Sequence, residues 1–182
     1  MEPPVSTTLV VVGEEAASAI RSLERFPNVH AATFSELSDA SDAQVARWSA
    51  AGDRPYVVHD RDPLAHVAAA WVEFYDDLST YEVLELEIER AVEASTRRAM
   101  HVPDYYVVLH PETLPVTWKH WWLGVVAVAS PTRVIPWPDA DESLAPLLRR
   151  LPTGRAWPKV DAWLPTVPGQ VPDRVGLTPP AA

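Results

Sequence analysis

Cysteine does not occur among the 182 residues. Disulfides, thiolate metal sites and a cysteine nucleophile are therefore excluded. Long apolar runs are missing as well, because the longest uncharged apolar stretch, residues 123–129, is far shorter than the roughly 20 residues that a membrane helix needs. Residues 1–12 also lack the basic segment that begins a secretory signal. The sequence therefore predicts a cytoplasmic protein with no membrane partner.

Positive charge is scarce, with 15 basic against 25 acidic residues and a net charge of −10. Residues 1–60 and 61–100 each hold nine acidic and four basic residues, whereas residues 101–182 hold seven of each. The first hundred residues therefore carry the whole imbalance. A negative field of this kind repels phosphate backbones, which argues against non-specific nucleic-acid binding.

The first 75 residues alternate between strand and helix patterns. β-branched and apolar runs predict strands at 7–12, 29–34 and 55–58. Helical spacing and stop signals predict helices at 14–25 and 38–51, and a third that starts at Asp62-Pro63, with Asp62 as its N-cap. Strand and helix alternating over short connections favours parallel strands joined by right-handed crossovers.

The second half begins with the clearest helix, residues 80–98, followed by a strand at 105–109. Residues 118–129 and 133–137 are rich in Trp and Val and predict two strands joined by a Ser-Pro-Thr turn. A short helix is expected at 142–151, and eleven of the nineteen prolines follow residue 130. The expected fold class is α/β in three layers, with a mixed sheet: a parallel N-terminal half and an antiparallel hairpin. We expect one domain over 1–167 and an extended, Pro-rich tail over 168–182.

Acidic side chains follow two of the predicted strands. Glu14 and Glu15 come after the first strand, and Asp60 and Asp62 come after the third, beside His59. If these strands are neighbours, as in the strand order 2-1-3, four carboxylates converge on one edge of the sheet, where α/β proteins place their sites. Such oxygen ligands suit Mg²⁺. The structural alternative is that Asp62 caps a helix and the two glutamates interact with a helix dipole.

The stretches Leu9-Val-Val-Val-Gly-Glu-Glu and Tyr56-Val-Val-His-Asp-Arg-Asp resemble two metal-binding α/β families. The resemblance to receiver domains of two-component signalling implies Mg²⁺ held by Glu14 and Glu15, with Asp60 accepting phosphate. The resemblance to Toprim domains implies Glu14 as the acid/base and Asp60 with Asp62 as Mg²⁺ ligands. Receivers usually carry aspartates in the first pair, and Toprim domains place a glycine after the glutamate, whereas Gly13 precedes it here.

Other catalytic signatures are missing. The turn after the first strand has neither Gly-x-Gly-x-x-Gly nor a P-loop, and no Gly-x-Ser-x-Gly elbow marks a hydrolase. Catalytic residues therefore stay unassigned. The sequence requires no cofactor, and the one it suggests is Mg²⁺.

Two further features predict a protein partner. Glu82, Glu85, Glu89 and Glu93 lie on one stripe of the predicted helix 80–98, and such an acidic stripe suits a basic partner. Trp121 and Trp122 lie on the predicted hairpin and form an aromatic contact surface unless the C-terminal segment with Trp157 and Trp163 covers it. The leading hypothesis is a non-catalytic interaction or accessory protein that uses either surface. The alternative is a Mg²⁺-dependent phosphoryl-transfer or signalling domain.

Overall fold

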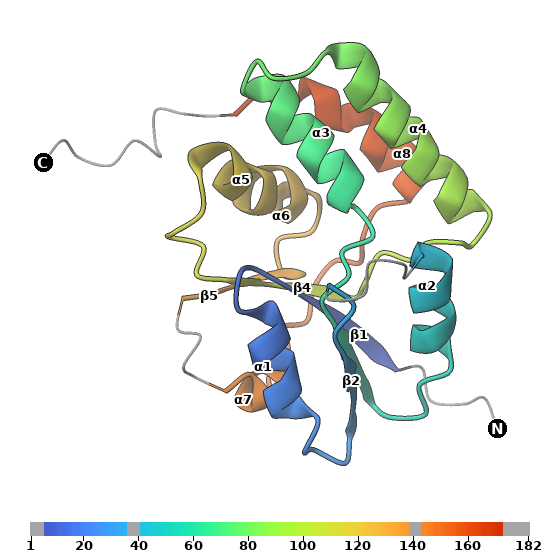
Figure 1. The fold of residues 1–182 in the computed structure, drawn as a ribbon, viewed down its shortest axis with the longest axis vertical. Helices are drawn as coiled ribbons and strands as arrows, with labels where there is room; N and C mark the ends of the chain where they lie inside the picture. The colour runs from blue at the N-terminus through green and yellow to red at the C-terminus, as the bar shows by residue number, and fades with distance from the viewer. Residues whose placement is uncertain (1–5, 36–40, 139–142, 173–182) are drawn as a thin grey trace, which may run out of the picture.

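A computed structural model describes residues 6–35, 41–138 and 143–172. Over these ranges the chain forms one sheet with helices on both faces (Figure 1). The strands are β1 (Thr7–Val12), β2 (Val29–Ala32), β3 (Tyr56–His59), β4 (Tyr105–Leu109) and β5 (Val134–Trp137). The larger helices are α1 (Ala16–Leu23), α2 (Asp42–Ala50), α3 (Ala65–Tyr75) and α4 (Tyr81–Thr96). None of the helices in the described ranges is long and apolar enough to cross a bilayer.

The strand order is β2-β3-β1-β4-β5, and every described pair of strands is parallel. The parallel N-terminal half agrees with the sequence prediction. β1 and β3 are neighbours, as the carboxylate hypothesis required, with Leu9 opposite Val58. The strand order assumed for that hypothesis, 2-1-3, differs from the observed one, however, because β3 and not β1 lies next to β2.

The predicted antiparallel hairpin is wrong, and the sheet is parallel instead of mixed. Residues 116–129 are helical, as α5 (Val116–His120), the π-helix η1 (Trp121–Val126) and α6 (Ala127–Ala129). They connect β4 to β5, which lie parallel, and parallel strands need a crossover of this kind. The buried residues of the segment recur at helical spacing: Trp121, Trp122, Val125, Val126 and Ala129. The segment is apolar on nearly all sides, as a central strand would be. Local periodicity does not distinguish such a strand from a buried helix.

The sheet separates two hydrophobic cores. Leu9 and Val11 point to the face that is covered by α1 and α7 (Ala145–Leu148). Val10 points to the opposite face, where α3, α4 and the α5-η1-α6 segment form a thicker layer. The side chains of β1 thus alternate between two covered faces, which is why the strand is an uninterrupted apolar run in the sequence. α2 lies on the same side as α3 and α4, apart from them, at the β2 and β3 end of the sheet (Figure 1).

The C-terminal segment packs on the thicker layer through α8 (Val160–Trp163) and the 3₁₀-helix η2 (Leu164–Gly169). Leu164 and Val167 are fully buried. The indole of Trp71 donates to the carbonyl of Val167, and the hydroxyl of Tyr75 donates to that of Pro168. The body of the protein therefore extends at least to Pro168, the first residue of the predicted tail, while residues 173–182 lie outside the described ranges.

Candidate functional site: a cavity beside helix α2

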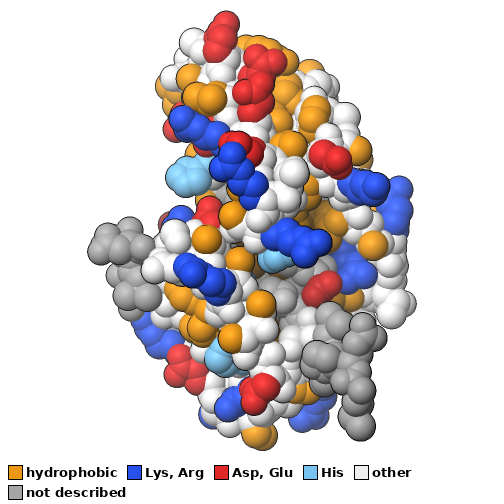
Figure 2. Space-filling model, turned by 90° about the vertical axis from the view of Figure 1, so that its right-hand side faces the viewer, with side chains coloured by type: hydrophobic (Ala, Val, Ile, Leu, Met, Phe, Trp, Pro, Cys, Tyr) orange, Lys and Arg blue, Asp and Glu red, His pale blue; other side chains and the backbone are white. Residues whose placement is uncertain are grey.

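The sheet is incompletely covered between α2 and the loop that leads into β4. A cavity of about 340 Å³ opens there. Its floor consists of polar residues from the strands and their ends, namely Ser6, Thr8, His59 and Asp104. Its walls are mainly apolar and come from α2 and from residues 100–103. Figure 2 looks onto this side of the molecule and shows hydrophobic side chains recessed between basic ones. We call this hollow the α2 cavity.

His59 is the most unusual group in the α2 cavity. It ends β3 on the same face as Val57, and only 4% of it is exposed. Trp48 and Phe34 lie edge-on against its ring, with centroids 6.0 Å away in each case. Its Nδ1 atom is buried and has no hydrogen-bond partner among the described residues. Buried polar atoms are nearly always paired, so an unpaired one on a residue that lines a cavity is unusual.

Burial also fixes the charge of His59. Desolvation lowers the pKa of the imidazole from 6.5 to about 4, against the opposing effects of the Asp60 charge and the Arg61 backbone. The ring is therefore neutral at physiological pH. A neutral imidazole has one donor and one acceptor nitrogen, so His59 offers a hydrogen-bonding group and not a positive charge.

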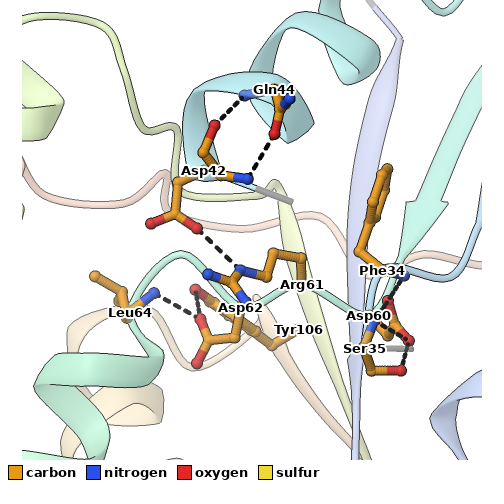
Figure 3. A network of polar contacts seen from close by, with 10 residues as sticks. Phe34, Ser35, Asp42, Gln44, Asp60, Arg61, Asp62, Leu64 and Tyr106 are labelled. Atoms are coloured by element: carbon orange, nitrogen blue, oxygen red, sulfur yellow. Dashed lines mark hydrogen bonds and ion pairs between the residues drawn. The ribbon is translucent and has the colours of Figure 1, made fainter. Parts of the chain in front are cut away.

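Asp60 holds the end of β2 in place. Its carboxylate accepts hydrogen bonds from the backbone N–H groups of Phe34 and Ser35 and from the Ser35 hydroxyl (Figure 3). The carboxylate is thus already occupied by donors that a loop provides.

Asp62 is buried and performs a different structural task. Its Oδ1 atom accepts from the backbone N–H of Leu64 at 2.8 Å and from the Tyr106 hydroxyl at 2.9 Å. Burial raises the pKa of this carboxyl to about 6, although both hydrogen bonds act in the opposite direction. The predicted N-cap role of Asp62 is wrong, because Leu64 is the N-cap residue of α3 and has no side-chain cap bond. The bond from Leu64 N–H instead stabilises the turn that precedes the helix.

Glu14 and Glu15 are exposed beyond β1. Glu15 approaches His110, whose Nε2 lies 3.9 Å from its Oε2, and the other ring nitrogen of His110 lies 3.3 Å from Glu112 Oε1. Among the described residues, no group of three or more His, Asp or Glu side chains is arranged to hold a metal ion. The structure therefore does not gather Glu14, Glu15, Asp60 and Asp62 into one cluster, and Mg²⁺ binding stays a prediction without geometric support.

The predicted partner surfaces differ in their placement. The four glutamates of the acidic stripe, Glu82, Glu85, Glu89 and Glu93, are all exposed on α4. Trp121 and Trp122 are not on the surface, since 0% and 5% of them are exposed, and they pack against Trp71 and Tyr106. The prediction of a Trp surface is wrong because residues 116–129 are helical, and this helical segment turns Trp121 toward α3 and Trp122 toward β4.

Sequence reasoning missed the α2 cavity. One signal was available, because Thr8 and His59 share one face of β1 and β3 with residues that are otherwise valine. Polar residues at inward positions mark a place where a sheet face is not covered by a core. The local sequence pattern did not predict how α2 lies relative to the loop before β4.

Comparisons of the chain with protein-family models, with curated proteins and with solved structures found no match. The receiver-like and Toprim-like resemblances thus receive neither support nor contradiction from them.

Proposed function

We propose that this protein is a binding domain for a small molecule, with the α2 cavity as its site. The single observation that carries the proposal is His59, a buried and neutral imidazole in the floor of a cavity of about 340 Å³, whose Nδ1 has no hydrogen-bond partner among the described residues. Small-molecule sites are typically concave, mainly apolar and about 300–1,000 Å³ in volume, with a few polar groups that orient the ligand.

The rim of the cavity supports the same proposal. Arg61 Nε lies 3.0 Å from Asp42 Oδ1, so that an ion pair joins the β3–α3 loop to the first turn of α2 (Figure 3). Both side chains line the cavity and are about one-third exposed. The pair fixes the start of the α2 wall, and a preformed wall reduces the ordering that a ligand has to bring about.

The proposal is tested with a library of ring-sized fragments and ¹⁵N-labelled protein. We expect several fragments at millimolar concentration to shift the amide resonances of residues 45–50 and 100–104. Ala46→Phe fills the cavity from its α2 wall and should abolish these shifts. Arg47→Phe adds the same ring at the adjacent, exposed position that does not line the cavity, and it should leave them unchanged. The absence of any binding fragment, or equal binding by both variants, would refute the proposal.

A second candidate function is the protein interaction that the sequence suggested, now confined to α4. Leu86 is 44% exposed in the middle of the acidic stripe, and Leu78 and Tyr81 are exposed at the end where α4 begins. Figure 2 shows acidic and hydrophobic side chains side by side over the end formed by α3 and α4. A mixed surface of this kind suits a basic amphipathic partner.

This second candidate is tested by association kinetics with a partner recovered from the host. Raising the salt concentration to about 0.5 M should slow association, because it screens attraction between exposed charges. Reversing Glu85 and Glu89 together to lysine should have the same effect, since both side chains are exposed. An association rate that is insensitive to both changes would exclude the acidic stripe as the docking surface.

A further inference from the structure

Two polar side chains of the α2 cavity, Ser6 and Asp104, offer hydrogen-bond acceptors. The Ser6 hydroxyl donates to the carbonyl of Arg54 at 2.6 Å and also lies 3.3 Å from that of Gly52. Its hydrogen is therefore committed, while its lone pairs stay available. Asp104 is acceptor-only when ionised, and one of its oxygens, Oδ2, takes the backbone N–H of Thr8 at 2.8 Å.

The charges that line the cavity do not cancel. Arg61 and Asp42 form an ion pair with each other, whereas no ion pair of Asp104 is present within the described residues. Arg133 comes near Asp104 but points at its backbone carbonyl, 3.4 Å away, and stacks on the ring of Tyr105. Asp104 is thus a carboxylate of the cavity that has no ion-pair partner in the part of the chain that the structure describes.

The apolar walls of the cavity determine which ligand body can bind beside the Asp104 carboxylate. Val45 and Ala46 form one side, and Met100 and Val102 form the other. Apolar surface on both sides favours a ligand with a compact hydrocarbon body, because its burial removes apolar area from water. The negative charge of the site lies at the floor of the cavity, where Asp104 accepts the Thr8 N–H.

We infer that the α2 cavity takes a small amine: a cationic ammonium group that donates to Asp104 and to the floor acceptors, attached to an apolar body that fills the space between α2 and the loop before β4. This inference rests on the proposed function and adds the chemical class of the ligand. Ionised hydrogen bonds are about twice as strong as neutral ones, so the ammonium group is the feature that the site distinguishes.

The test compares benzylamine, benzyl alcohol and benzoate, which share one ring and differ in the polar group. Dissociation constants are measured by amide shifts at pH 8, where histidine side chains are mostly neutral and an alkylamine is protonated. We expect benzylamine to bind about tenfold more tightly than benzyl alcohol, and benzoate to bind most weakly.

Two variants separate a specific contact from general attraction to an acidic protein. Asp104→Asn keeps an oxygen for the Thr8 N–H and removes the charge, and it should weaken benzylamine about tenfold while benzyl alcohol stays unchanged. Asp53→Asn removes the same charge from an exposed residue that neighbours Gly52 but does not line the cavity. It should change neither affinity beyond a small screening effect.

The outcomes distinguish the two proposals. Equal affinity for benzylamine and benzyl alcohol, tighter binding of benzoate, or no effect of Asp104→Asn would overturn the amine inference and leave small-molecule binding intact. If none of the three probes binds to the wild-type protein and the fragment library also fails, both proposals are refuted.

Discussion

The hydroxyl of Tyr106 donates to Oδ1 of Asp62 across a distance of 2.9 Å, which joins β4 to the loop after β3. These strands are not neighbours, because β1 lies between them. The tyrosine therefore reaches over the central strand to a carboxyl group in the layer of α3. Burial raises the pKa of Tyr106 well above its ordinary value, and the contact with Asp62 raises it further. It also places a proton-binding group, Asp62, inside the protein.

The Asp62 carboxyl should make stability fall as pH rises. Its pKa is raised in the fold from 3.8 to about 6, so its contribution is complete below about pH 4 and is lost as pH rises through 6. The loss amounts to roughly 3 kcal/mol at about 1.4 kcal/mol per pKa unit. Asp62→Asn keeps the acceptor and does not titrate. Urea unfolding at a series of pH values should show the variant gaining that amount relative to wild type between pH 4 and 7. Parallel stability curves would contradict the buried, titrating carboxyl.

His59 should act in the opposite sense. Its pKa is lowered in the fold from 6.5 to about 4, so its contribution is complete above pH 6.5 and is lost as pH falls toward 4. His59→Gln should therefore gain roughly 3 kcal/mol relative to wild type as pH falls from 7 to 4. The two residues offset each other in the wild-type protein between pH 4 and 6. In the double variant with Asp62→Asn, the stability difference from wild type should vary little with pH over that interval, and a steep slope there would show that other groups dominate.

The C-terminal segment should contribute to the stability of the whole domain. Leu164 is fully buried against α3 and α4, so Leu164→Ala should destabilise the protein by about 2–5 kcal/mol. Val171 lies seven residues further on and is 70% exposed, and Val171→Ala should change stability by less than about 0.5 kcal/mol. Thermal or urea unfolding of both variants checks this. A small effect of Leu164→Ala would mean that the segment does not pack on the body in solution.

Gly13 should not tolerate a side chain. It has a φ of +125° at the end of β1, and an added Cβ would lie 3.0 Å from the Leu109 Cβ and 3.2 Å from the Leu109 carbonyl oxygen. Gly13→Ala should therefore cost about 1–3 kcal/mol. Gly169 has ordinary φ and open space around it, so Gly169→Ala should be neutral or slightly stabilising. Equal unfolding midpoints for the two variants would contradict the turn geometry at the end of β1.

Elements with strong local signals could be predicted from the amino-acid sequence alone. β1 and β4 begin and end at the predicted residues, because β-branched and aromatic runs bounded by turn residues allow few other structures. Helix α4 follows its predicted stripe, with Leu84, Ile88 and Ala91 buried and the four glutamates exposed. Amphipathic periodicity fixes both the element and the face it buries.

The form of residues 116–129, the placement of the acidic residues and the α2 cavity depend on contacts between segments that are distant in the chain. Residues 116–129 are apolar on nearly every side, and their helical form depends on the parallel pairing of β4 with β5, which lies outside any local window. The four acidic residues after β1 and β3 were adjacent in the predicted topology, yet Asp60 and Asp62 accept hydrogen bonds from Ser35 and Tyr106, residues distant in the chain. The α2 cavity arises for the same reason: it is bounded by segments that meet only when the sheet and its helices assemble, and packing between distant segments determines where a face of the sheet stays uncovered.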